Sequence, residues 1–72
     1  MARIAASIKD VNIVTGWHDG EFYAICYTDA ERGNALRTIG RWASNPQLSF
    51  DWRDAGGMGA AIRKLESERA HA

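Results

Sequence analysis

The sequence has one cysteine, one proline and no excess of charge of either sign. With a single thiol, Cys26, the chain has no internal disulfide and no pair of thiolates for a structural zinc ion. Nine Lys and Arg residues balance nine Asp and Glu residues, so the whole domain is not attracted to nucleic acid or anionic lipid. Any extra stability must come from packing or from a partner.

Long hydrophobic runs are also missing. A secretory signal needs about 7–15 consecutive apolar residues and a membrane-spanning helix about 20, and Lys9 and Asp10 interrupt the first apolar segment. The composition, 46% hydrophobic and 25% charged, is that of a folded domain. We expect a single cytoplasmic domain over residues 1–72, with a frayed tail at 70–72 and no membrane contact.

A β-hairpin is the clearest element in the sequence. Asp19-Gly20 is a favoured pair for a two-residue type I′ turn, in which both central residues have positive φ. The flanking segments 11–17 and 22–27 are rich in β-branched and aromatic residues, as strands are. Apolar and polar residues also alternate over 4–8, which indicates an extra N-terminal strand.

Counting outward from the turn divides the hairpin side chains between two faces. The apolar face is predicted to be the core, and it carries Val11, Ile13, Trp17, Phe22, Ala24 and Cys26. The other face mixes aromatic and polar side chains and is expected to be partly exposed; it carries Asn12, Val14, His18, Glu21, Tyr23, Ile25 and Tyr27.

A helix is predicted after the hairpin. Thr28 and Glu31 have the spacing of a capping box, and apolar residues recur at helical intervals over 35–43. Asn45-Pro46 ends the segment. Because two glycines within it lower helix propensity, a strand over 36–43 is the alternative.

The last third of the chain predicts a strand and a helix. Residues 47–52 alternate between polar and apolar, as in a short half-buried strand, and Asp54 is placed to N-cap a helix with a regular apolar stripe. The expected fold is α+β: a small antiparallel sheet with two helices, in the order ββαβα. A four-stranded antiparallel sheet with one C-terminal helix is the alternative.

Few residues point to chemistry. Gly57 and Gly59 open the last helix, where backbone N–H groups could bind phosphate, but the dinucleotide and Walker patterns are incomplete and close packing explains the glycines better. His18 is expected to pair across the hairpin, and Asp51 and Asp54 to flank the helix start. We therefore expect no enzyme, no cofactor and no metal site.

Charge is uneven along the chain although it sums to zero. Residues 1–31 carry two basic and five acidic side chains, and residues 32–72 carry seven basic and four acidic. Arg37 and Arg41 lie one helical turn apart and predict a basic face. This face suits an acidic protein partner or, with Arg53 on phosphates and a stacked Tyr23, a nucleic acid.

The aromatic residues are more numerous than a core of this size needs. Five of them are expected inside: Trp17, Trp42, Trp52, Phe22 and Phe50. Tyr23 and Tyr27 are then left on the partly exposed face, which two short helices would not cover, and with Arg37 and Arg41 they form the predicted protein-binding surface.

The leading functional hypothesis is a protein-interaction module that binds another protein, or a second copy of itself, as an accessory subunit or inhibitor. Domains this short are common among phages and mobile elements, including inhibitors of host defence. This prior rests on size alone. A nucleic-acid-binding module is the alternative.

Overall fold

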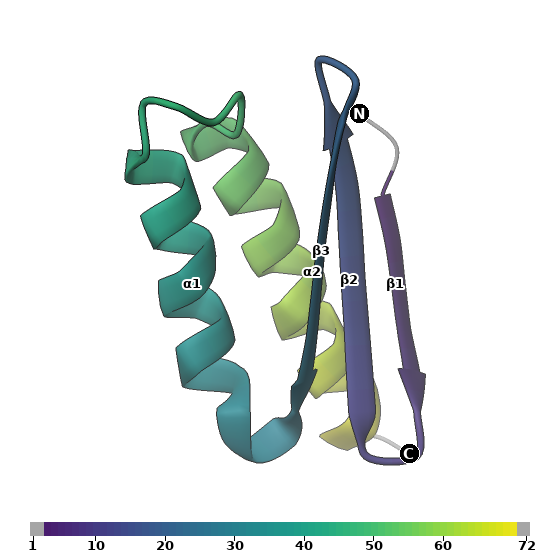
Figure 1. Ribbon diagram of the computed structural model, residues 1–72. Helices are drawn as coiled ribbons and strands as arrows, with labels where there is room; N and C mark the ends of the chain where they lie inside the picture. Colours follow the sequence, from purple (N-terminus) through teal and green to yellow (C-terminus); the bar gives the residue numbers. More distant parts are fainter. Residues whose placement is uncertain (1–2, 71–72) are drawn as a thin grey trace.

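The structure, a computed structural model, describes residues 3–70 and confirms an α+β fold. A three-stranded antiparallel sheet in the order β1-β2-β3 is followed by two helices (Figure 1). The elements are β1 (Arg3–Ile8), β2 (Val11–His18), β3 (Glu21–Thr28), the 3-10 turn η1 (Asp29–Glu31), α1 (Arg32–Ser44) and α2 (Trp52–Ala70). The chain order is thus βββαα. Residues 71 and 72 of the expected frayed tail lie outside the described residues, whereas Ala70 ends α2.

The hairpin turn and the register of the two strands that it joins are those predicted from the sequence. Asp19 and Gly20 have φ values of 51° and 79°, the positive angles that a type I′ turn requires. His18 pairs with Glu21, and each pair counted outward from the turn is the predicted one. The extra N-terminal strand is also present, since β1 pairs antiparallel with β2 along its whole length.

The prediction of which sheet face is covered is wrong. Both helices lie on one side of the sheet (Figure 1), and they cover the face with mixed aromatic and polar side chains. Val14, Tyr23 and Tyr27 are buried there, at 0%, 8% and 4% exposure. The core also contains Ala35, Ile39, Phe50, Met58, Ile62 and Leu65.

Asn12 shows why a face with polar residues can be buried. Its side chain is 1% exposed, and its amide nitrogen donates to the Tyr27 carbonyl at 3.3 Å and to Asp29 Oδ1 at 2.8 Å. Its amide oxygen accepts from Ser7 Oγ and from the Arg69 guanidinium. Because every polar atom of the amide has a partner, burial is not penalised as it would be for an unpaired group.

Residues 30–43 are helical, which excludes both the strand over 36–43 and the four-stranded alternative. The predicted capping box is present, because the backbone N–H and hydroxyl of Thr28 both hydrogen-bond to Glu31 Oε1 at 3.1 Å. This contact lowers the pKa of Glu31. The apolar stripe of α1 then buries Ala35 and Ile39 against the sheet and α2.

The strand predicted over 47–52 is absent, and its residues form the loop between the helices and the first residue of α2. One of the alternating apolar residues, Phe50, packs into the core from this loop. It is 2% exposed, and its ring centroid lies 4.9 Å from that of Tyr23 and 5.5 Å from that of Trp42. Trp52 is 65% exposed, contrary to its predicted place in the core. Within the described residues, no helix has the length and apolarity needed to span a membrane.

Candidate interaction surface

Among the described residues, no helix packs on the sheet face turned away from α1 and α2 (Figure 1), and on this face Thr15, near the middle, is 8% exposed. We call this surface the outer face. Since residues paired across antiparallel strands share a side of the sheet, the register assigns it Ala6 and Ile8 of β1, Val11, Ile13, Thr15 and Trp17 of β2, and Phe22, Ala24 and Cys26 of β3. None of these nine residues is acidic or basic.

Large apolar side chains on the outer face are in contact with solvent. Ile8 is 63% exposed, Phe22 53%, Trp17 48% and Val11 42%. Three of them, Val11, Trp17 and Phe22, are residues that the sequence places in the core. All four are exposed because the two α-helices of the described residues, which together have about the width of one sheet face, both pack on the opposite side.

The side chains of the outer face differ in size from row to row along the strands. Trp17 and Phe22 lie directly opposite each other next to the hairpin turn, with ring centroids 4.8 Å apart and planes tilted by 56°. In the next row toward the middle, Thr15 pairs with Ala24 of β3 and with Ile4 of β1, and Thr15 is 8% exposed. The aromatic pair therefore projects at the hairpin end of the outer face.

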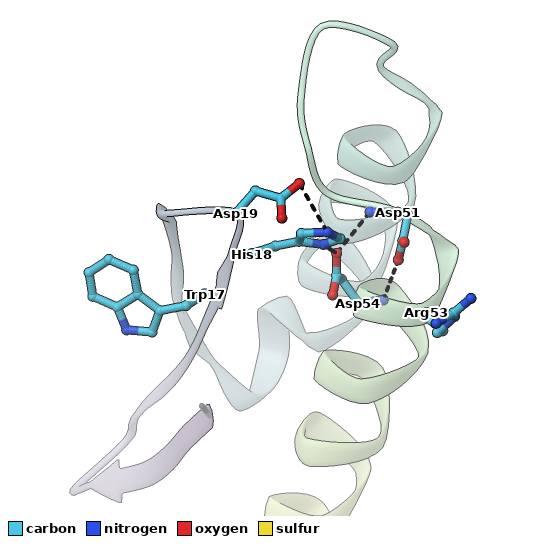
Figure 2. A pocket seen from close by; sticks show the side chains of 6 residues that line it. All are labelled: Trp17, His18, Asp19, Asp51, Arg53 and Asp54. Atoms are coloured by element: carbon cyan, nitrogen blue, oxygen red, sulfur yellow. Dashed lines mark hydrogen bonds and ion pairs between the residues drawn. The ribbon is translucent and has the colours of Figure 1, made fainter. Parts of the chain in front are cut away.

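A polar pocket lies at the same end of the hairpin, on the side of the sheet where the helices pack (Figure 2). It encloses about 460 Å³ and is lined by Trp17, His18, Asp19, Asp51, Arg53 and Asp54. The His18 ring lies between the carboxylates of Asp19 and Asp54, while Trp17 and Arg53 point away from this cluster.

Asp51 and Asp54 cap the start of α2 reciprocally. The Asp51 backbone N–H donates to Asp54 Oδ2 at 2.9 Å, and the Asp54 N–H donates to Asp51 Oδ1 at 3.0 Å. The first helical bond runs from the Ala55 N–H to the Asp51 carbonyl. The N-cap is therefore Asp51, and Asp54, predicted for that role, occupies the third helical position of a capping box.

His18 joins the hairpin to this helix cap. Its Nδ1 contacts Asp54 Oδ2, and its Nε2 lies 3.5 Å from Asp19 Oδ2. The hydrogen bond to Asp54 raises the pKa of His18 against the opposing effect of burial. For Asp54, only 6% exposed, burial acts to raise the pKa, but the Asp51 N–H and His18 outweigh it and the pKa is lowered.

The same cluster has the donor set of a cation site. One ligand atom each from His18, Asp51 and Asp54 lies within 4.8 Å of the others. However, Asp54 Oδ2 already accepts from His18 and from the Asp51 N–H, and Asp51 Oδ1 accepts from the Asp54 N–H. These hydrogen bonds describe a helix cap held to the hairpin by an ion pair.

Comparison with known proteins supplies no relative. No family model, curated protein or solved structure matches this chain.

Tyr23 and Tyr27, predicted to bind a partner, lie beneath the helices. The Tyr23 hydroxyl lies 2.9 Å from Ser49 Oγ and donates to Glu21 Oε1 at 3.2 Å, and burial raises the pKa of Tyr27. Neither ring is available for a protein contact, and Tyr23 is not available for base stacking. The sequence separated the two hairpin faces correctly, and exchanging which face is buried gives the outer face.

Arg37 and Arg41 lie exposed on α1, as predicted. Arg37 donates to the Asn34 side chain and Arg41 to Thr38 Oγ1 at 3.2 Å, and neither has an acidic partner among the described residues. Arg53 is also exposed, at the beginning of α2. These arginines lie on the helical layer and are separate from the outer face.

Gly57 and Gly59 lie within α2, at its sixth and eighth residues. Only the first turn of a helix has unpaired N–H groups, so these two amides belong to the helical hydrogen-bond ladder and do not form a phosphate cradle. A Cβ at Gly59 would lie 3.7 Å from Leu36 Cδ2 of α1, an ordinary contact distance, and a Cβ at Gly56 would meet nothing within 4 Å, so close packing does not require glycine at either position.

Proposed function

We propose that this protein is a small interaction module that binds another protein through its outer face. The observation that carries the proposal is a sheet face on which the register places no acidic or basic side chain and four large apolar residues are 42% to 63% exposed, Trp17 and Phe22 at the hairpin end and Ile8 and Val11 at the other end. Exposed apolar patches of this kind mark interaction sites on small soluble domains.

We expect the Trp17–Phe22 pair to contribute most of the binding energy. Aromatic residues dominate interface hot spots because they bury a large area and lose few rotatable bonds. The two rings already contact each other, at 4.8 Å between centroids, so a partner meets a partly ordered ridge. Ordering fewer side chains on binding lowers the entropic cost.

The role we infer is that of an accessory subunit or inhibitor, which acts by occupying a surface of its partner. The polar side chains of the pocket serve the helix cap and its ion pair with His18, and this engagement supports a non-catalytic role. An inhibitor encoded by a phage or mobile element is one instance of this class, and only chain length supports it.

Capture of partners from the native host tests the proposal. Wild-type protein, a Trp17→Ala/Phe22→Ala variant and a Trp52→Ala variant serve as baits. Trp52 is the matched control because it is exposed but belongs to α2 and not to the outer face. We expect a partner bound by the wild type and by Trp52→Ala at equal levels, and at least tenfold less by the double variant. Equal capture by a folded double variant contradicts the proposal.

Nucleic-acid binding is the second candidate, supported by the absence of acidic partners for Arg37 and Arg41 among the described residues. The burial of Tyr23 removes the stacking contact that the sequence suggested. Binding through these arginines would weaken steeply with salt, because each neutralised phosphate releases counterions. A titration of labelled single- and double-stranded probes at two salt concentrations tests it.

A further inference from the structure

We propose that the free edge of β3 is a second binding surface, on which an extended acidic segment of a partner protein pairs as a fourth strand. This edge is separate from the outer face, and its use goes beyond the proposed function and does not depend on it. Three features of the described residues meet there: unpaired backbone groups, a groove beside α1, and two arginines without acidic partners.

The backbone of β3 offers hydrogen bonds along its outer edge. β3 is the last strand of the sheet, and the hairpin turn pairs His18 with Glu21. Hydrogen-bonded and non-hydrogen-bonded pairs alternate from this two-residue turn, so the N–H and C=O groups of Phe22, Ala24 and Cys26 point away from β2. No group of the described residues pairs with them. An extended peptide can pair with such an edge by strand addition.

β3 lacks the features that commonly protect an edge strand. It is eight residues long, pairs with β2 without a bulge, and contains no proline and no charged residue after Glu21 at its start. Natural edge strands are often short, charged, bulged or covered, because an open edge accepts a further strand. The edge of β3 is therefore suited to accept one.

Helix α1 lies over this edge. It follows β3 through η1 and runs back beside it (Figure 1). The sheet contacts of α2 are mainly with β1 and β2, whereas α1 packs on β3. Packed helices lie about 8–10 Å apart and strands about 4.8 Å, so α1 lies over β3 and the space beside it. A groove of about 240 Å³ between them is lined in part by Ile25, Ala35 and Thr38, and it gives a fourth strand a surface to cover.

Two arginines at the rim of the groove favour an acidic occupant. Arg37 donates to the side chain of Asn34 and Arg41 to that of Thr38, and both acceptors line the groove. Neither arginine has an acidic partner among the described residues. Glu31, which also lines the groove, already accepts two hydrogen bonds in the capping box. Carboxylates of an added strand therefore meet guanidinium groups with donors to spare.

The β1 edge and a second copy of the chain fit less well. The grooves beside β1 are lined by charges of both signs, Lys64, Glu68 and Arg69, and Arg69 is already paired with Asp29. Two copies joined at β3 would place their α1 helices side by side, with the arginines of one near those of the other, and like charges brought together oppose association. The observations therefore favour an acidic segment of another protein.

Selection from a phage-displayed library of random peptides, about seven residues long as strands are, tests the proposal on the full chain. We expect the selected peptides to have acidic residues two positions from an apolar residue, because alternate residues of a strand share a face. Arg37→Ala/Arg41→Ala is expected to bind a selected peptide about tenfold more weakly than the wild type. Arg63→Ala/Lys64→Ala removes the same charge from exposed positions of α2 and is expected to bind it equally.

Amide hydrogen exchange of the wild type reports the backbone pairing without any variant. A bound peptide is expected to slow exchange about tenfold or more at Phe22, Ala24 and Cys26, whose amides it would pair. Ala5 and Ser7 of β1, at the opposite edge of the sheet, are the control and are expected to exchange at the same rate with and without the peptide.

Absence of any selected peptide, or equal binding of the selected peptide by both double variants, overturns the proposal. Binding that leaves the three β3 amides unprotected does the same. Protection of these amides in the free protein that grows with its own concentration would identify a second copy as the occupant and would also overturn it. Partner capture through the outer face depends on the Trp17→Ala/Phe22→Ala comparison and fails separately.

Discussion

Among single residues, Asn12 shows how a polar side chain can be buried on the sheet face that the helices cover. Its buried amide connects β1, β3, η1 and α2 through Ser7, the Tyr27 carbonyl, Asp29 and Arg69. A polar residue in a strand is ordinarily a sign of solvent exposure. The partners that make its burial favourable come from segments up to 57 residues away, so no local pattern reveals them.

Replacing Asn12 tests this account of the buried face. Asn12→Ala removes the hydrogen bonds of a buried side chain to Ser7, to the Tyr27 carbonyl and to Asp29, and a loss of this kind costs about 1–3 kcal/mol in the free energy of unfolding. Urea denaturation followed by circular dichroism measures the change. Asn34→Ala, at an exposed position of α1, is the control and is expected to lose less than about 0.5 kcal/mol. Equal effects of the two substitutions would contradict the account.

The ion pair of His18 and Asp54 makes stability depend on pH. The pKa of His18 is raised above its ordinary 6.5, so its contribution is full below pH 6.5 and is lost as the pH rises through the folded-state pKa. The pKa of Asp54 is lowered below 3.8, so its contribution is present above pH 3.8 and is lost as the pH falls through the folded-state pKa. The pair therefore stabilises most between these two values.

Thermal unfolding of the wild type and His18→Gln over a pH series checks this window. We expect the difference in melting temperature between the two proteins to be largest near pH 5 and to shrink above neutral pH. A difference that stays constant from pH 5 to 9 would show that His18 contributes through packing and not through its charge.

At the scale of elements, the features that depend on neighbouring residues were predicted correctly, and those that depend on contacts between distant segments were not. The type I′ turn and the capping box depend on neighbouring residues, and the sequence located both, together with the register of the hairpin. The covered sheet face depends on where α1 and α2 dock, and the strand predicted over 47–52 depended on a pairing that is not made. The sequence therefore located the elements of the candidate site but assigned it to the wrong face.

The glycines of α1 and of the hairpin turn respond in opposite ways to the same substitution. A Cβ at Gly40 would meet nothing within 4 Å, and Gly40 lies inside a helix, so Gly40→Ala is expected to raise the free energy of unfolding by about 0.5–1 kcal/mol. Gly20 has φ +79°, so Gly20→Ala is expected to lower it. Urea denaturation measures both, and a destabilised Gly40→Ala would mean that α1 packs more closely than described.

At the scale of the whole molecule, the protein has two unlike surfaces. The outer face is apolar and uncharged, and α1 presents Arg37 and Arg41 on the opposite, helical layer. A zero net charge therefore does not indicate a uniform surface. The apolar surface supports the proposed function more strongly, because leaving Trp17, Phe22 and Ile8 in water forgoes about 25 cal/mol for each Å² that a partner could bury.

Site-specific photocrosslinking in the native host tests the central claim, partner binding through the outer face, most directly. A benzophenone amino acid replaces Phe22 on the outer face in one protein and the equally aromatic, exposed Trp52 on α2 in another. We predict that the position-22 probe forms a covalent adduct with one host protein and that the position-52 probe does not. An adduct formed from position 52 alone, or from neither position while a partner still co-purifies, would contradict the claim.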